Sequence, residues 1–491
     1  MGLRLRSVLL IIAAVLFLPA AVPPGTASEI LRLESERSLG GGRLATLLTS
    51  PDAATAARAA LAIGRTKQAE GASLLERSVN DPRAAIRAFS IYGLGLIGLG
   101  TDAGLITQAL GSDGSGAVRV AALDALGRYE DAKRLDSVGE ADAAAAVARV
   151  LTSDPDPVLR GRAAITLNFF AAGPDAASAL GALTTAMPLE QIPSVRERIM
   201  WTVFRRYATK VPVAFLRAGL SDSNEVVRIE AVRAYGHLTG AALVADLQPM
   251  LNDPSWRVQE QAAESIRLLQ GGKLSDHWTA IPSFVHTPVP QPDPFASVAG
   301  YNQPACICNG APLVENMHDW GPPLLPSTAA DMLAPAHGPH PRLRIVTTQG
   351  NIYVALYPEW APLTVQNFIN LVNRGFLDNN PWFRIVPDFV VQTGEQDAKN
   401  APGPGYTIPA EENPLEQNSY VLSMGLNYDD KANTPIRDSA GSEYYITLSP
   451  QYHLDNAFTV FGAMTSGFDV LGRLSESDKV IRIERIADVT L

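Results

Sequence analysis

The residues best suited to soft-metal chemistry gather between positions 273 and 341. Both cysteines of the 491-residue chain, Cys306 and Cys308, lie in this segment. Five of the seven histidines accompany them: His277, His286, His318, His337 and His340. Thiolates and imidazoles together can bind zinc or copper, but a single residue between two cysteines does not match a closed zinc motif. A strained disulfide, two free thiols and a metal site therefore remain open alternatives.

The same segment has the composition of a connector. Thirteen of the 36 prolines fall within these 69 residues, in runs such as HTPVPQPDP, and no helical or strand period survives there. Such a composition favours an extended, partly polyproline chain between two folded parts. Two cysteines in the whole chain also exclude a disulfide scaffold.

A repeated pair, an apolar residue followed by arginine, precedes the connector. The pairs recur at intervals of 29 to 41 residues, and the seventh has lost its arginine: Ala57-Arg58, Ile86-Arg87, Val118-Arg119, Leu159-Arg160, Val195-Arg196, Val227-Arg228 and Val258-Gln259. Most follow turn residues such as Asp81-Pro82, which begin helices. Two short helices fit each interval, and they bury their apolar stripes only by stacking.

This pattern resembles HEAT repeats and predicts an all-α solenoid over residues 45–272. Because the arginines recur at one repeat position, we expect them to pack and cap within the array. By analogy with other solenoids, we expect the array as a whole to offer a surface to a protein partner.

The first residues of the chain have the pattern of a targeting segment. Arg4 and Arg6 precede an apolar run from Val8 to Leu18, and small residues follow around Ala21 and Ala27. That run is too short to span a bilayer, which needs about 20 residues. We therefore predict that residues 1–27 are a signal peptide and that the mature chain is secreted or periplasmic, without a membrane span. An uncleaved segment would instead anchor the protein to the membrane.

From residue 342 onward the pattern changes to strands. Leu343 and Ile345 alternate with other residues before a turn at 349–351, and Ile352, Val354 and Leu356 do so after it, which predicts a β-hairpin. A helix is expected over residues 362–374, with proline at its start and glycine after its end. Its buried face would carry Val365, Phe368, Ile369 and Val372.

Five segments of this region, taken in order, resemble a cyclophilin-type peptidyl-prolyl isomerase. They are APLTVQNFINLVNRGF, FRIVPDFVVQTGE, SMG, DSAGSEYYITLS and HLDNAFTVFGAMTSGFDVL, and the resemblance spans residues 342–491. It implies an eight-stranded β-barrel capped by two helices. The chain is then multidomain: signal peptide, HEAT-like solenoid, proline-rich connector over 273–341, and cyclophilin-like barrel.

The resemblance also implies a reaction, rotation about X–Pro bonds, that requires no cofactor and no metal. Arg384 matches the catalytic arginine, and Gln392 matches the glutamine that bonds the substrate backbone. The other matching positions are implied to bind substrate: Phe389, Val390, Gly425, Leu426, Glu443, Tyr445, His453, Leu454 and Phe458. Without the resemblance, Phe389 and Tyr445 would be assigned to the core.

Several of these positions depart from the best-known family pattern. Glu443 replaces glutamine, Tyr445 replaces phenylalanine, His453 replaces tryptophan and Phe458 replaces histidine. Because Arg384 is kept, we expect an isomerase that assists folding of proline-containing proteins outside the cytoplasm, with reduced activity or altered preference. A catalytically weak or inactive scaffold that binds peptides is the alternative.

The charge of the chain is concentrated in its last third. Residues 342–491 hold 11 Lys+Arg and 18 Asp+Glu, so they carry −7 of the formal net charge of −10. A nucleic-acid binder needs a clustered basic surface, so the composition argues against nucleic acid as a partner.

Overall fold

The structure is a computed structural model that describes residues 24–272, 340–386, 388–395, 403–429 and 434–489. The chain divides into two compact units, residues 1–273 and 274–491, which are described here one at a time. Both cysteines and four of the five connector histidines lie outside the described residues, as does the apolar leader. Among the described residues, no helix combines the length and the apolarity that crossing a membrane requires.

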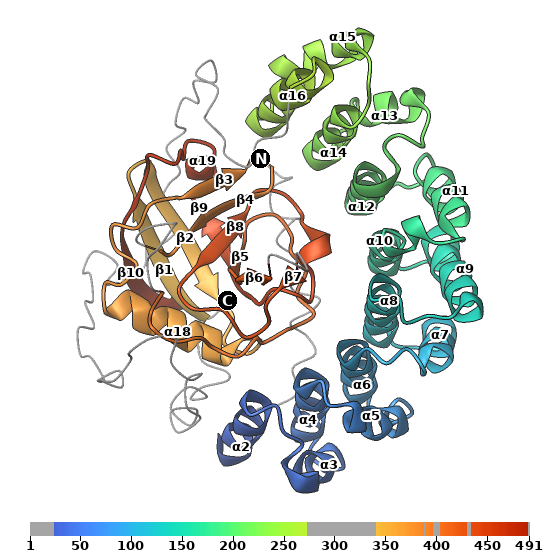
Figure 1. Ribbon diagram of the computed structural model, residues 1–491, viewed down its shortest axis with the longest axis vertical. Helices are drawn as coiled ribbons and strands as arrows, with labels where there is room; N and C mark the ends of the chain where they lie inside the picture. The colour runs from blue at the N-terminus through green and yellow to red at the C-terminus, as the bar shows by residue number, and fades with distance from the viewer. Residues whose placement is uncertain (1–23, 273–339, 387, 396–402, 430–433, 490–491) are drawn as a thin grey trace. The chain divides into compact units, whose positions relative to one another are not determined.

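The first unit is an array of paired helices, as the repeat pattern predicts (Figure 1). One row of helices stacks in succession: α4 (Ala53–Thr66), α6 (Ala84–Ile97), α8 (Gly116–Asp131), α10 (Pro157–Thr166), α12 (Pro193–Thr202), α14 (Glu225–Gly236) and α16 (Trp256–Leu269). Shorter or flanking helices form a second row against it: α3 (Arg43–Leu48), α5 (Ala72–Ser78), α7 (Ala103–Ser112), α9 (Ser137–Ser153), α11 (Ala176–Ala186), α13 (Val213–Gly219) and α15 (Val244–Leu247). The apolar stripes meet between the rows.

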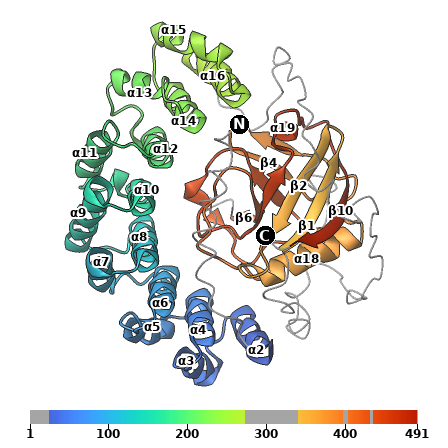
Figure 2. The same cartoon turned by 180° about the vertical axis from the view of Figure 1, so that it is seen from behind.

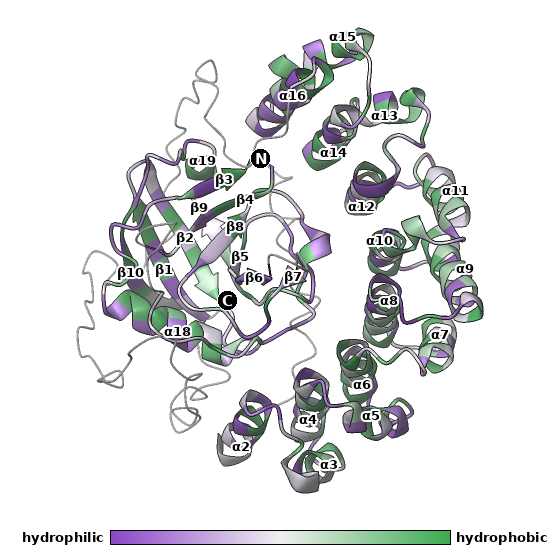
Figure 3. Ribbon diagram, in the orientation of Figure 1, coloured by the Kyte–Doolittle hydropathy of each residue, from purple (hydrophilic) through white to green (hydrophobic). Residues whose placement is uncertain are grey.

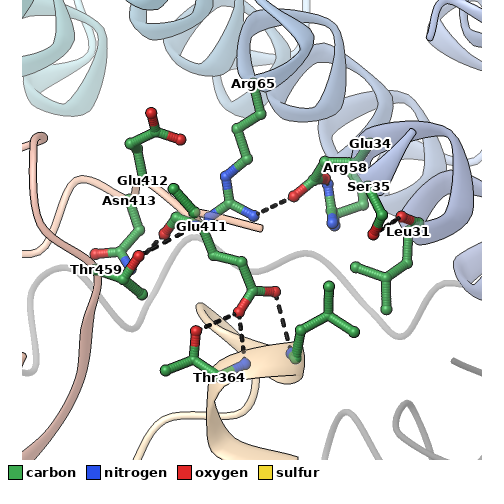
Figure 4. A network of polar contacts seen from close by, with 12 residues as sticks. Leu31, Glu34, Ser35, Arg58, Arg65, Thr364, Glu411, Glu412, Asn413 and Thr459 are labelled. Carbon is green, nitrogen blue, oxygen red and sulfur yellow. Dashed lines mark hydrogen bonds and ion pairs between the residues drawn. The ribbon is translucent and has the colours of Figure 1, made fainter. Parts of the chain in front are cut away.

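The array begins earlier than residue 45, where the sequence pattern places its start. Helix α2 (Pro24–Ser35) packs against α4 and buries Ile30 and Leu31 completely. Its Glu34 forms ion pairs with Arg58 at 2.5 Å and Arg65 at 2.7 Å, which are drawn in Figure 4. The repeat signal missed this helix because the first of the seven recurring pairs, Ala57-Arg58, stands on α4, two helices later.

The recurring arginines form a ladder along the array. Five of them reach the acidic residue in the turn before the next helix of the stacked row: Arg87–Asp113, Arg119–Asp154, Arg160–Glu190, Arg196–Asp222 and Arg228–Asp253. The sixth, Arg58, pairs instead with Glu34 of the preceding repeat. Arg160 is typical, because its Nε and Nη2 donate to Glu190 at 2.7 and 3.0 Å. Its Nη1 donates to the carbonyls of Asp154 and Pro155 at 2.9 and 3.1 Å. The expectation that these arginines pack and cap within the array is therefore confirmed.

The second unit is a curled antiparallel sheet of eight strands in the order β10-β1-β2-β9-β5-β8-β4-β3 (Figures 1 and 2). The strands are β1 (His340–Thr347), β2 (Gly350–Leu356), β3 (Arg384–Val386), β4 (Val390–Thr393), β5 (Val421–Met424), β8 (Tyr444–Thr447), β9 (Val460–Ser466) and β10 (Val480–Val489). A separate pair joins β6 (Tyr428–Asp429) to β7 (Thr434–Pro435). Helix α18 (Pro362–Asn373) lies near β1 and β10 in both views, and the second helix, α19 (Phe468–Leu471), is a single turn.

The two ends of the sheet meet through the segment that precedes β3. The N–H of Trp382 donates to the carbonyl of Asp478 at 3.1 Å, and that of Val480 to Asn380 at 2.9 Å. These bonds link the chain before β3 to the start of β10, so the sheet curls around one core.

The predicted hairpin is confirmed, with its turn one residue earlier than expected. Thr347 pairs with Gly350, which leaves residues 348 and 349 as the loop. All five predicted core side chains of the hairpin are fully buried, and Figure 3 shows hydrophobic and hydrophilic residues alternating along these strands. Gly350 has a φ of +135°, a backbone conformation that glycine adopts without strain.

Helix α18 is confirmed with the predicted buried face, and a distant carboxylate caps its first turn. Glu411 accepts the N–H groups of Leu363 at 3.1 Å and Thr364 at 2.8 Å, and the Thr364 hydroxyl at 2.8 Å (Figure 4). A buried negative charge at a helix N-terminus accepts hydrogen bonds from N–H groups that have no partner within the helix. It also interacts favourably with the positive end of the helix dipole. At the other end, Gly375 at φ +65° follows the last turn and closes it.

Candidate active site

Strand register brings the main polar residues of the site into one row. Arg384 pairs with Gln392 across β3 and β4, Gln392 with Tyr445 across β4 and β8, and Tyr445 with Ser423 across β8 and β5. Residues directly opposite on neighbouring strands share a face of the sheet. Their neighbours along the strands, such as Val391 and Tyr444, belong to the barrel core. The row therefore lies on the face away from the core.

Beside this row lies a small apolar cluster that is separate from the barrel core. It consists of Val390, Tyr445, Leu454 and Phe458, with Phe389 and Leu426 packed against it. Tyr445 and Phe458 meet edge to face with ring centroids 6.0 Å apart. The structure thus brings together six of the predicted substrate-binding residues, drawn from four stretches of the chain. An apolar cluster of this size suits a ring as small as that of proline.

His453 extends the cluster on one side. It belongs to the 3-10 turn Tyr452–Leu454, and its ring stacks on Phe389 with centroids 5.9 Å apart and planes 19° apart. The same turn supplies Leu454, so one short element carries two predicted site residues.

Arg384 is held by a neutral group and an aromatic ring. Its Nη1 donates to Oε1 of Gln392 at 3.1 Å, and its guanidinium carbon lies 5.4 Å from the centroid of the Phe389 ring. Among the described residues, no carboxylate forms an ion pair with Arg384. Because a guanidinium stays protonated and has five rigid donors, this arginine keeps charge and donors available for a ligand.

Gln392 connects Arg384 to a second charged group, Glu443. Its Nε2 donates to Oε1 of Glu443, which precedes β8. Burial, reinforced by the negative charge of Glu395, raises the pKa of Glu443 to about 7, against the stabilising effects of Gln392 and Arg384. The predicted residue Gly425 lies beneath this carboxylate, since a Cβ there would be 2.7 Å from Glu443 Oε1.

Sequence reasoning missed a buried glutamine behind the cluster. Gln417 Oε1 accepts the hydroxyls of Ser423 at 3.0 Å and Tyr445 at 3.3 Å, and its backbone N–H donates to Asp455 at 2.7 Å. It therefore holds the hydroxyl of Tyr445, a group that the phenylalanine of the best-known family pattern lacks. Nothing in the surrounding loop, EENPLEQNSY, marks this glutamine.

His340, one of the metal-capable residues, lies in β1 and contacts two side chains. Its ring meets Tyr357 edge to face at 5.6 Å, and its Nε2 lies 3.5 Å from Oε1 of Glu359. Burial lowers the pKa of His340 and raises the pKa of Glu359 to about 7. In the part of the chain that the structure describes, no group of three or more His, Cys, Asp or Glu residues could hold a metal ion.

Comparisons with known families agree with the two units. Residues 342–490 match the family described as cyclophilin type peptidyl-prolyl cis-trans isomerase. Residues 42–127 and 213–277 match the family described as HEAT repeats.

Two curated relatives each cover about a quarter of this chain. Peptidyl-prolyl cis-trans isomerase B of Bacillus subtilis (strain 168) is 40% identical over 133 residues, which cover 26% of this chain and 87% of that protein. Peptidyl-prolyl cis-trans isomerase-like 1 of Aspergillus niger is 37% identical over 128 residues, covering 26% of this chain and 77% of that protein. A crystal structure of a cyclophilin type peptidyl-prolyl cis-trans isomerase of Cryptosporidium parvum covers 30% of this chain and 99% of its own, with 22% identity and a TM-score of 0.28.

Proposed function

Because the chain belongs to the cyclophilin-type peptidyl-prolyl cis-trans isomerase family, we propose that Arg384 is the residue through which its barrel catalyses rotation about X–Pro bonds. The observation that supports this role is the position of Arg384 in the structure. It lies beside the apolar cluster, held by the neutral Gln392 amide and without an ion-pair partner among the described residues.

The reaction needs a donor rather than a nucleophile. Rotation about the amide faces a barrier of about 18–20 kcal/mol because the C–N bond has partial double-bond character. In the twisted transition state the prolyl nitrogen regains its lone pair and can accept a hydrogen bond. A guanidinium placed at that nitrogen stabilises the twisted state more than the planar ground state, which lowers the barrier.

The apolar cluster and Gln392 would hold the substrate for this step. The proline ring would lie against Phe389, Tyr445 and Phe458, while the side chain of Gln392 bonds the peptide backbone. With a peptide bound, the same cluster would exclude water around the reacting amide, so the charge of the guanidinium would act in a low-dielectric environment.

An exchange assay on a proline-containing peptide tests this role. Arg384→Ala should lower kcat/KM by about 10²- to 10³-fold, the usual cost of removing one transition-state donor. Arg344→Ala is the matched control, because Arg344 lies on β1 and pairs with Glu484. Equal activity of wild type and Arg384→Ala would show that Arg384 is not catalytic. Peptide binding without turnover by the wild type would favour the scaffold alternative.

For localisation we propose export of the mature chain, on the strength of the basic and apolar leader. Cleavage near Ala21 would leave α2 whole, whereas cleavage near Ala27 would remove its first turn and weaken the base of the array. Sequencing of the mature N-terminus from the extracytoplasmic fraction would give the cleavage site. An intact leader on protein that stays in the cytoplasm would contradict export. In an extracytoplasmic compartment the isomerase would speed the slow X–Pro steps of folding proteins.

For the array we propose recruitment of a protein partner through an acidic segment. The supporting feature is a cationic cluster where α12 passes into the π-helical turn Val203–Tyr207. The guanidinium carbon of Arg233 lies 4.0 Å from the Phe204 ring centroid, and that of Arg205 lies 5.9 Å from the Trp201 centroid.

The charge of Arg205 is poorly compensated in this cluster. Its Nε is buried and has no hydrogen-bond partner among the described residues. Burial and the charges of Arg233 and Arg206 lower its pKa to about 10, and Glu230 opposes them only in part. The Arg205 side chain is only partly buried as a whole, so a carboxylate from a partner could approach the exposed part of the guanidinium and supply the missing charge.

Binding of labelled acidic and neutral peptides to the full chain tests this surface. Arg205→Ala should weaken acidic-peptide binding about tenfold, and added salt should weaken it further. Arg217→Ala is the control, because this exposed arginine already pairs with Asp246 at 2.8 Å outside the cluster. Equal losses in the two variants, or equal binding of neutral peptides, would remove the support for this surface.

A further inference from the structure

Glu443 ends a chain of polar contacts that begins at Arg384. Arg384 donates to the oxygen of the Gln392 amide, and the nitrogen of that amide donates to Glu443. The three side chains come from β3, β4 and the residue before β8, which are adjacent in the sheet. Gly425 leaves space for the carboxylate, because a Cβ there would approach Glu443 Oε1 to 2.7 Å.

The protonation state of Glu443 determines which way the amide of Gln392 can face. A glutamine amide has an accepting oxygen and a donating nitrogen, whereas a guanidinium can only donate. An ionised carboxylate can only accept, so ionised Glu443 and Arg384 demand the same orientation of the amide. A protonated Glu443 has an O–H donor of its own, and the amide can then turn its oxygen to Glu443. That turn would place the amide nitrogen, a donor, against the donors of Arg384.

The groups around Glu443 place its ionisation near neutral pH. Burial is the largest effect and, with the repulsion from Glu395, raises the pKa of Glu443 to about 7, whereas Gln392 and Arg384 stabilise the carboxylate. Glu395 lies two residues after β4. Burial raises the pKa of the Tyr428 phenol in β6, and the charge of Arg384 opposes this effect only in part, so the phenol is neutral near pH 7. His453, stacked on Phe389, is a further titratable group at the site.

We propose that Glu443 is a positioning residue whose ionised carboxylate fixes the amide of Gln392, and through it Arg384, so that isomerase activity rises as Glu443 loses its proton. This inference rests on the proposed role of Arg384. Glu443 itself need not touch the reacting amide bond.

We expect the pH dependence of kcat to follow the ionisation of Glu443 alone. For a peptide without ionisable side chains, wild-type kcat should rise by about five- to tenfold between about pH 5.5 and about pH 8.5, the effect of one correctly oriented hydrogen bond. KM should change less, because the apolar cluster does not titrate. Guanidinium groups in proteins stay protonated throughout this range and give such a profile no slope.

Glu443→Gln is the conservative variant that carries the test. Its amide keeps an oxygen that can accept from Gln392 but has no proton to lose, so its kcat should be nearly independent of pH. Because a glutamine amide has donors as well as an acceptor, as the protonated carboxyl does, kcat of the variant should lie within about threefold of the low-pH wild-type value. His453→Gln should keep the wild-type rise. A flat or falling wild-type profile, or a rise that survives in Glu443→Gln, would overturn the inference.

Two further measurements keep this inference apart from the proposed role of Arg384. If Arg384→Ala is as active as wild type, the proposed role fails whatever the pH profile. If Arg384→Ala is inactive while the wild-type profile is flat, only the inference on Glu443 fails. The NMR signals of the Gln392 side-chain amide give a readout without turnover. They should shift with the same midpoint as kcat in the wild type and stay constant in Glu443→Gln, and constant wild-type signals would overturn the inference.

Discussion

The arginines of the array and the arginine of the barrel site are held in opposite ways. Along the array each ladder arginine faces a carboxylate. Arg196, for example, donates to Asp222 at 2.7 and 2.9 Å, and its Nη1 donates to two backbone carbonyls. In the barrel, Arg384 is held by the neutral amide of Gln392 and the face of Phe389. The same side chain therefore serves as a structural link in one unit and as an available charge in the other.

The difference shows how a protein can assign one residue type to stability and to chemistry. A bidentate carboxylate fixes a guanidinium and neutralises it. A neutral acceptor fixes it without neutralising it, and the carboxylate of Glu443 stands one amide away. Breaking a ladder pair should therefore lower stability without affecting catalysis, and changes around Arg384 should do the reverse.

The largest expected effect on stability is at the ladder. Arg196→Ala should destabilise the array by about 3 kcal/mol, because Asp222 would keep a mostly buried charge and two carbonyls would lose their donor. Calorimetry of the full chain would measure the loss, and the isomerase rate should not change. Arg217→Ala, which breaks an exposed pair, should cost less than about 1 kcal/mol. Equal costs would mean that the ladder adds nothing to ordinary surface pairing.

The second-largest effect on stability is expected at Glu411, the carboxylate that caps α18. Glu411→Gln should lower barrel stability by about 2 kcal/mol, because the ionised group accepts three hydrogen bonds at the start of α18 and opposes the helix dipole. The melting transition of the barrel measures this cost. No change would mean that the amide oxygen satisfies the first turn equally well, and that the charge is irrelevant there.

Replacement of Glu443 should raise the stability of the barrel, whereas replacement of Glu411 should lower it. The folded-state pKa of Glu443 is raised from 4.5 to about 7, so its favourable contribution is complete below about pH 4.5 and is lost as the pH rises through about 7. Glu443→Gln should therefore stabilise the barrel by about 1–2 kcal/mol near pH 8 and by almost nothing near pH 5. Melting curves of wild type and variant at the two pH values give the difference. A gain of the same size at both values would contradict a raised pKa.

The smallest effect should come from the hydroxyl behind the apolar cluster. Tyr445→Phe keeps the ring against Phe458 and removes the bond to Gln417, so it should cost about 1 kcal/mol or less and change kcat/KM by less than about threefold. Urea unfolding and the exchange assay measure the two quantities. A large loss of activity with little loss of stability would show that the hydroxyl contacts the substrate.

Much of both folds could be predicted from local patterns. The alternation along Leu343 and Ile345, and along Ile352 and Val354, predicted the hairpin. Proline at the start of 362–374 and glycine after its end predicted α18. The repeat interval predicted stacked helix pairs. These features depend on the period of apolar residues and on turn residues, which act over a few positions along the chain.

The partners of the charged residues could not be predicted in this way. Motif matching selected Arg384 and Gln392, but only strand register shows that they are cross-strand neighbours and that Glu443 holds the far end of the same amide. Likewise, the recurring arginines were visible in the sequence, but stacking of the repeats assigned five of them to an acid 25 to 35 residues further on and Arg58 to Glu34 in the preceding repeat.

The sequence by itself determined the elements, their order and the residue types available for chemistry, because helices, strands and turns follow from local spacing. Only the tertiary structure decided which charges are neutralised and which remain available. That choice depends on contacts between residues far apart in the chain, such as Gln417 with Tyr445 and Glu411 with α18, and on the burial that gives each contact its strength.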